Sequence, residues 1–120
     1  MTPDRPALSD VERGLVAGIL IGEGHFGGDG RQPQITLRMH VRHESLFRFL
    51  ERLFPRARLY GPYDHSGRRY YQWMARGEAL VQDVLPVVES VLTDEVDAHV
   101  AGRVREMRER YADFFRSADR

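Results

Sequence analysis

The chain has 120 residues, of which 42% are hydrophobic and 30% charged, the composition of one ordinary globular domain. No apolar run approaches the roughly 18 residues that a membrane span needs, and the first residues lack the basic and apolar regions of a signal peptide. Because the sequence has no cysteine, disulfides and thiolate metal sites are excluded. We expect one cytoplasmic, intracellular domain over residues 10–120 after an N-terminal arm over residues 1–9.

The formal net charge of zero hides a basic middle segment. Residues 31–76 contain ten arginines and three acids, a charge of +7, whereas residues 1–30 carry −3 and residues 77–120 carry −4. All 18 basic residues are arginine, and tyrosines are interleaved with those of the middle segment. This pattern suits a polyanion such as nucleic acid. The alternative is a solvated surface whose arginines pair with acids elsewhere, and the face they occupy decides between the two.

The first predicted element is a helix. Ser9 and Glu12 form a capping box, so the helix begins near residue 10, and Gly24 ends it. Its predicted inward residues are Val11, Leu15, Val16, Ile19 and Leu20. Gly18 and Gly22 lie one turn apart, and each costs about 1 kcal/mol against alanine. Either a neighbouring helix approaches closely there, or the pair is tolerated near a helix end.

Next comes a strand over residues 34–42, in which polar and apolar residues alternate. The inward set is Ile35, Leu37, Met39 and Val41, and the outward set is Gln34, Thr36, Arg38, His40 and Arg42. An amphipathic helix over about 44–54 follows, and Pro55 terminates it.

The second half predicts a hairpin and further helices. Strands at 58–61 and 69–75 flank a loop at 64–67, and the outward residues of the second strand are Tyr70, Gln72, Met74 and Arg76. A helix over 78–85 is broken by Pro86. A long final helix spans about 94–116, with an apolar stripe of Val96, Val100, Val104, Met107, Tyr111 and Phe114.

The order of these elements predicts an α+β domain with one antiparallel sheet. The apolar face of the sheet lies under the helices, and the other face is free for solvent or ligand. On that free face the alternation places arginine, glutamine, threonine and histidine side by side. These side chains reach base edges and phosphates, so we expect a nucleic acid as the partner.

Residues 16–24, VAGILIGEG, resemble the motif of the LAGLIDADG homing endonucleases in its form ending in GEG. The basic alternating strand, the Phe- and Leu-rich helix and the Tyr-x-Trp-x-Ala-x-Gly strand follow in the family's order, so the resemblance covers about residues 10–115. It implies an αββαββα domain whose saddle-shaped four-stranded sheet sits in the DNA major groove. A chain with one motif, as here, is expected to form a homodimer through its motif helices.

The resemblance also implies functional residues. Glu23 of each subunit would be a catalytic metal ligand for Mg2+ or another divalent cation, which would offset the roughly 0.3–1 kcal/mol penalty of an acid at a helix C-terminus. His43 is a candidate for holding the nucleophilic water, or is a surface histidine without a role. The expected dimer contacts are Val16, Gly18, Ile19 and Gly22, and the expected DNA contacts are Gln34, Thr36, Arg38, His40, Arg42, Arg68, Tyr70, Gln72 and Arg76.

The sequence departs from the family at two places. Ile21 replaces the usual Asp of the motif, and no lysine is present near the expected metal centre, where residues 87–93 contain no basic residue. Three functions therefore stay open. The first is a magnesium-dependent, site-specific endonuclease cleaving a pseudo-palindromic site. The second is a non-cleaving DNA-binding regulator or RNA-splicing maturase, and the third is a domain that binds protein through its basic face.

Overall fold

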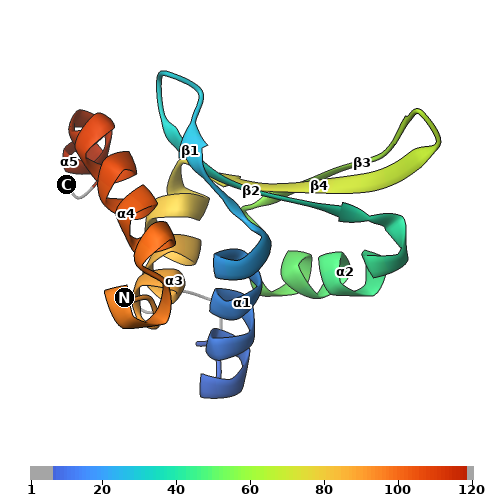
Figure 1. Ribbon diagram of the computed structural model, residues 1–120, viewed down its shortest axis with the longest axis horizontal. Helices are drawn as coiled ribbons and strands as arrows, with labels where there is room; N and C mark the ends of the chain where they lie inside the picture. Colours follow the sequence, from blue (N-terminus) through green and yellow to red (C-terminus); the bar gives the residue numbers. More distant parts are fainter. Residues whose placement is uncertain (1–6, 119–120) are drawn as a thin grey trace.

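Residues 7–118 are described by a computed structural model, in which helices alternate with pairs of strands (Figure 1). The elements are α1 (Asp10–Glu23), β1 (His25–Gly28), β2 (Pro33–His40), the 3-10 turn η1 (Val41–His43), α2 (Glu44–Leu53), β3 (Arg58–His65), β4 (Arg68–Arg76), the π-helical turn η2 (Ala79–Val84), α3 (Leu85–Glu89), α4 (Asp94–Arg110) and α5 (Ala112–Ala118). Residues 1–6 of the predicted arm and 119–120 of the predicted domain lie outside the described residues. Within the described residues, no helix combines the length and the apolar character needed to cross a membrane.

The four strands form one antiparallel sheet in the order β1-β2-β4-β3. The helices lie on one side of this sheet, and the tips of both hairpins rise on the other side, so the uncovered face is concave (Figure 1). We call this uncovered side the open face. The α+β prediction, with a saddle-shaped four-stranded sheet and helices on one face, is confirmed.

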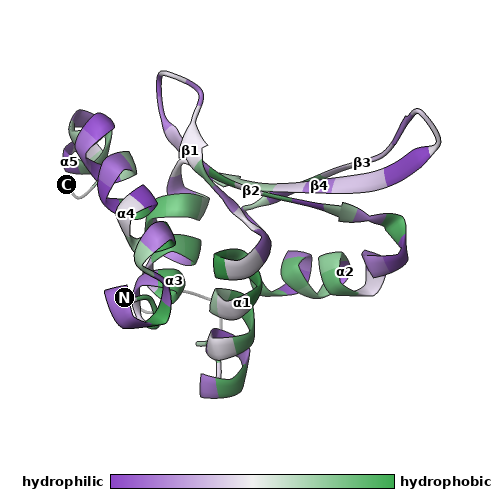
Figure 2. Cartoon of the chain, viewed as in Figure 1, coloured by the Kyte–Doolittle hydropathy of each residue, from purple (hydrophilic) through white to green (hydrophobic). Residues whose placement is uncertain are grey.

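The core lies between the sheet and the helices. Ile35 and Leu37 are buried as predicted, and they pair in register with Ala75 and Trp73 of β4, which are buried too. The facing core residues come from several helices: Val16, Leu20, Phe47, Leu50, Leu80, Val84 and Val88. Hydrophobic residues accordingly cluster along α1 and α3, whereas the far end of the β3–β4 hairpin is hydrophilic (Figure 2).

Helix α1 begins and ends as predicted, but its inward residues are only partly those expected. Ser9 and Glu12 form the capping box, with hydrogen bonds of 2.9 and 3.1 Å. Val11 and Leu15 are 80% and 46% exposed, so their predicted burial is wrong. The helix runs away from the sheet, and its N-terminal half projects beyond the core (Figure 1).

The strand boundaries also differ from the prediction. Strand β2 ends at His40 because residues 41–43 turn into η1, so Val41 and Arg42 do not continue the strand. The β3–β4 hairpin is longer than expected, and its turn is Ser66 and Gly67 alone. Both have positive φ (54° and 82°), the backbone conformation of a two-residue hairpin turn.

Two helical predictions need correction. Pro86 does not end the helical segment: η2 continues directly into α3, and Pro86 lies in the first turn of α3. The predicted final helix is two helices, because the backbone at Tyr111 (φ −110°, ψ 33°) leaves the helical conformation. Val96 is 54% exposed, and Phe115 is buried more fully than the expected Phe114.

An ion pair joins the loop before β3 to η2. The Arg56 guanidinium donates to both oxygens of Asp83 at 2.8 and 2.7 Å and to Glu78 at 2.6 Å. The Asp83 side chain is 1% exposed, so its carboxylate depends on protein donors rather than water. These bonds raise the pKa of Arg56 above its ordinary value.

We expect Arg56→Met to lower the free energy of unfolding by about 3 kcal/mol, because it removes the guanidinium from a buried carboxylate. Urea denaturation followed by the fluorescence of Trp73, the single tryptophan, measures this change. The matched control is Arg105→Met, which breaks an exposed pair with Asp94 and should cost less than about 1 kcal/mol. Equal losses of unfolding free energy in the two variants would contradict a stabilising role of the buried Arg56–Asp83 ion pair.

Candidate nucleic-acid interface

The open face carries polar side chains from β2 and β4 at its centre. Strand register places Arg38 opposite Gln72, His40 opposite Tyr70 and Gln34 opposite Arg76. The Arg38 side chain donates to Gln72 Oε1 at 2.8 Å, and its guanidinium lies 5.9 Å from the centre of the Tyr70 ring. The structure thus brings together predicted residues of β2 and β4 that are 30 to 42 positions apart in the sequence.

Two of the predicted DNA-contact residues, Thr36 and Arg42, are not exposed side chains of β2 as expected. Thr36 is on the open face by alternation but is only 8% exposed between its neighbours His25 and Met74 in the sheet, so it has almost no free surface for a ligand. Arg42 belongs to η1 instead of β2, and its backbone N–H donates to Nδ1 of His40 at 2.9 Å. Its side chain still reaches the open face, because it lines a pocket at the end of the β3–β4 hairpin.

At the end of the β3–β4 hairpin, basic side chains surround a cavity of about 670 Å³, which we call the hairpin pocket. Its lining residues are Arg38, Met39, His40, Arg42, His65, Gly67, Arg68, Arg69 and Tyr70. The turn at η1 brings Arg42 to this pocket beside the predicted Arg68. Sequence reasoning missed His65 and Arg69. A correct hairpin length would have indicated His65, whereas alternation places Arg69 on the face opposite Arg68 and Tyr70.

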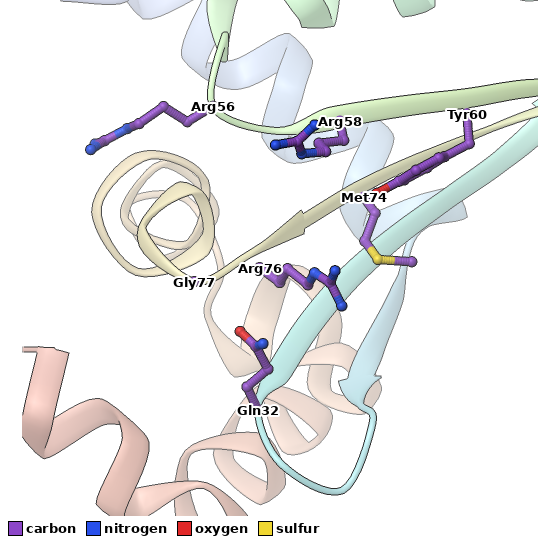
Figure 3. Close-up of a pocket in the computed structure, with 7 residues that line it drawn as sticks. All are labelled: Gln32, Arg56, Arg58, Tyr60, Met74, Arg76 and Gly77. Atoms are coloured by element: carbon purple, nitrogen blue, oxygen red, sulfur yellow. The ribbon is translucent and has the colours of Figure 1, made fainter.

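A second cavity, of about 360 Å³, lies at the opposite end of β4; we call it the edge pocket. Arg58, Tyr60, Met74 and Arg76 project from β3 and β4, and Gln32 approaches from the residue before β2 (Figure 3). The guanidinium of Arg56 extends away from these side chains to its acidic partners (Figure 3). Arg58 and Tyr60 were missed because only the pairing of β3 with β4 shows that they share the open face.

Some arginines of the molecule pair with acids and others do not. On the helical side Arg48 pairs with Glu44 and Glu51, Arg105 with Asp94 and Arg108 with Glu89, and on the sheet Arg76 lies near Asp29. Among the described residues, Arg52 and Arg110 of the helices have no acidic partner. On the open face, Arg38, Arg42, Arg58 and Arg68 form no salt bridge with an acid within residues 7–118. The alternative in which the middle arginines pair with acids elsewhere is therefore wrong for this group, and the open face carries an excess of positive charge.

Glu23 is the last residue of α1 and is exposed. A Cβ at Gly24 would lie 2.6 Å from the Leu20 carbonyl oxygen, so only glycine allows the chain to leave the helix here. Within the described residues, the Glu23 carboxylate has no hydrogen bond or ion pair, and no three histidines or acids cluster to hold a metal. One chain thus supplies a single carboxylate, a suitable but incomplete ligand set for Mg2+.

His43 is the last residue of η1 and is exposed where α2 begins. Glu23 lies at the end of α1, directly before β1. The joint catalytic role of Glu23 and His43 stays a prediction.

One side of α1 is left uncovered by the other described residues. Val11, Leu15, Gly18 and Gly22 are exposed along it, and we call them the α1 stripe. A Cβ at Gly18 or Gly22 would meet no atom within 4 Å, so packing within the chain does not require glycine at either position. Of the other predicted dimer contacts, Ile19 is half-buried and Val16 is fully buried, so Val16 offers no surface to a partner.

These features define a domain with a helix-covered sheet, a concave basic face and a carboxylate at the end of a glycine-containing helix. No model of a known protein family matches the sequence, and no curated protein matches it either. Among solved structures, the group I intron-encoded homing endonuclease I-CeuI, complexed with DNA, matches with a TM-score of 0.66 and 16% identity over 88% of this chain and 56% of that chain.

The I-LtrWI LAGLIDADG homing endonuclease bound to target DNA also matches, with a TM-score of 0.53 and 11% identity over 92% of this chain and 46% of that chain. This chain spans about half the length of the proteins it matches. It has the fold of the LAGLIDADG homing endonucleases, and the resemblance read from the motif is confirmed at the level of the fold.

Proposed function

We propose that this chain is a site-specific, magnesium-dependent endonuclease that acts as a homodimer on double-stranded DNA with a pseudo-palindromic site. The observation that carries the proposal is the open face itself: Arg38, Arg58 and Arg68 of the concave sheet and Arg42 of η1 have no acidic partner within the described residues, and the motif carboxylate Glu23 is at the end of α1. The fold neighbours that are bound to DNA support the same function.

The chemistry of the open face suits a duplex. Arginines of the hairpin pocket and the edge pocket would contact phosphates at the two ends of the open face, because a guanidinium group forms bidentate hydrogen bonds with phosphate oxygens. Between them, Arg38 and Gln72 hold each other and point to the bases; arginine recognises guanine and glutamine recognises adenine. Phosphate contacts would supply affinity, and this central pair would supply sequence preference.

A homodimer through the α1 stripe would complete the catalytic site. A two-fold contact pairs identical surfaces, and glycines let two helix backbones approach closely. Such a contact would bring the Glu23 carboxylates of both subunits together to hold Mg2+, which prefers oxygen ligands and keeps bound waters. When bound, the ion would lower the pKa of a water nucleophile and stabilise charge on the attacked phosphate.

We expect Gly18→Leu to convert the dimer to a monomer without destabilising the folded chain. The new side chain enters open space in the monomer, and leucine favours the helix by up to about 1 kcal/mol over glycine. Analytical ultracentrifugation measures the oligomeric state, and urea denaturation measures stability. The control Ala98→Leu adds the same bulk at an exposed position of α4 and should remain dimeric. A dimeric Gly18→Leu variant would refute the interface.

A second candidate function is that of a non-cleaving DNA-binding regulator or RNA-splicing maturase. The lack of a basic residue near the expected metal centre favours it. The chain contains no lysine, and residues 87–93 contain no basic side chain. Val87 and Val88 of that segment are buried in the core. Such a protein would use the same open face and would not cut.

One experiment separates these functions. The protein is incubated with a randomised double-stranded DNA pool, with magnesium or with a chelator, and bound and cleaved molecules are sequenced separately; an RNA pool forms a parallel arm. Cleavage that requires magnesium supports the endonuclease, and binding without cleavage supports the regulator. Tighter binding of RNA supports the maturase. Weak, salt-independent binding of both pools would refute a nucleic-acid function and favour a protein partner.

A further inference from the structure

Tyr111 connects the helical layer to the loop between β1 and β2. It lies where α4 ends and α5 begins, and its ring is buried. Its hydroxyl oxygen accepts a hydrogen bond from the backbone N–H of Gly30 at 3.0 Å, across 81 positions of sequence. The hydroxyl of one C-terminal side chain thus fixes the backbone at the tip of a hairpin of the sheet.

The end of β1 is shaped to receive this tyrosine. A Cβ placed on Gly28 would lie 2.3 Å from the Tyr111 hydroxyl oxygen and 2.4 Å from Cζ, distances that no real side chain tolerates. The tyrosine therefore rests directly on the backbone of β1, and only glycine leaves room for it. Nearby, Arg103 donates to the Phe26 carbonyl oxygen at 3.2 Å and attaches α4 to the same strand.

The loop held by Tyr111 is also ordered from within. Asp29 Oδ1 accepts hydrogen bonds from the backbone N–H groups of Arg31 and Gln32 at 2.8 and 2.9 Å, and these bonds lower the pKa of Asp29 from its ordinary value. The Asp29 N–H donates to the Gln32 carbonyl oxygen at 3.1 Å. Residues 29–32 are thus one closed unit, and fixing Gly30 fixes the whole unit.

This unit belongs to the candidate interface. Gln32 lines the edge pocket with Arg58 and Arg76, and Asp29 Oδ2 lies 3.9 Å from Arg76 Nη1. Arg31 is exposed at the loop tip. A loop that is ordered before binding does not lose conformational freedom when it meets a ligand, so its side chains contribute more affinity and discriminate more sharply.

We propose that Tyr111 is a positioning residue for DNA recognition: it holds residues 29–32 so that Arg31 and Gln32 meet the outer part of the site. This inference rests on the proposed function. It assigns a role to α4 and α5, which lie outside the αββαββα core: through Tyr111 they support the loop at one end of the open face. Tyr111 itself does not touch the ligand.

The test uses Tyr111→Phe, which keeps the buried ring and removes only the hydroxyl. Base preference at each position is measured from the bound fraction of the randomised DNA duplex pool. We expect about a fivefold loss of preference, the effect of one hydrogen bond, at the positions that Gln32→Ala also weakens. In Tyr111→Phe, base preference should be unchanged at the DNA positions where Arg38→Ala weakens it. Ser117→Ala, which removes an exposed hydroxyl from α5, is the control and should change nothing.

A double-mutant cycle separates positioning from a general structural role. If Tyr111 acts through the loop, adding Tyr111→Phe to an Arg31→Ala, Gln32→Ala background causes no further loss; an equal loss in both backgrounds overturns the proposal. Hydrogen exchange at the Gly30 amide should accelerate in Tyr111→Phe, and Gly28→Ala, which displaces the ring, should weaken the same positions. Wild-type protein that binds no DNA would refute the proposed function, whereas wild-type binding with unchanged preference in Tyr111→Phe would refute this inference alone.

Discussion

Glu23→Gln is expected to abolish magnesium-dependent DNA cleavage while DNA affinity changes less than about twofold. Glutamine keeps the size and the hydrogen-bonding capacity of glutamate but is a poor ligand for a hard cation. A catalytic metal ion supplies several kcal/mol of transition-state stabilisation, so its loss corresponds to at least about a thousandfold in rate. Single-turnover cleavage of a selected duplex measures the rate, and filter binding in chelator measures affinity.

Glu109→Gln is the matched control, since Glu109 is an exposed acid on α4, which is not part of the sheet or of α1. It should cleave at the wild-type rate. Mixed dimers of wild-type and Glu23→Gln subunits add a further test, because a site that needs both carboxylates would lose most activity with one replaced. Unchanged cleavage by Glu23→Gln would remove Glu23 from the metal site and leave its position at the end of α1 without a functional explanation.

The triple variant Arg42→Ala, Arg58→Ala, Arg68→Ala is expected to lower DNA affinity at least about a hundredfold at low salt. Each of these arginines lines one of the two pockets on the open face, and a hydrogen bond to a charged group contributes about 1.5–3 kcal/mol. Each lost phosphate contact also releases fewer counterions, so the slope of log affinity against log salt should become shallower by about three. Fluorescence anisotropy with a labelled duplex at several salt concentrations measures both.

A control with the same change in net charge is available on the helical side. Arg48, Arg105 and Arg116 pair with acids there, and their triple alanine variant also removes three positive charges. It should keep the wild-type salt slope and lose less than about threefold in affinity. Equal effects of the two triple variants would show that binding responds to net charge alone and would refute the open face as the interface.

Much of the fold was predictable because its determinants are local. The capping box of Ser9 and Glu12 and the glycine at position 24 define both ends of α1. Alternation with period two placed Ile35 and Leu37 against the core and Arg38 on the open face, and the amphipathic pattern over 44–54 gave α2. Such patterns act over one or two turns or strands, so no knowledge of distant neighbours is required.

The remaining features depend on neighbours that are distant in sequence. Helix tilt exposes Val11 and Leu15, and the turn of η1 rather than alternation sends Arg42 to the hairpin pocket. Cross-strand neighbours cover Thr36. Local patterns carry no information on these contacts, because each arises where separate elements meet.

The sequence by itself determined the class of fold, the basic character of the middle segment and the position of Glu23 at a helix end. Only the tertiary structure decided which arginines are free, that Arg58 and Tyr60 share the open face, and that Tyr111 reaches Gly30. The physical reason is the range of the interactions. Capping, periodicity and glycine punctuation act between residues a few positions apart, whereas strand register, ion pairing and the docking of α4 on β1 join residues tens of positions apart.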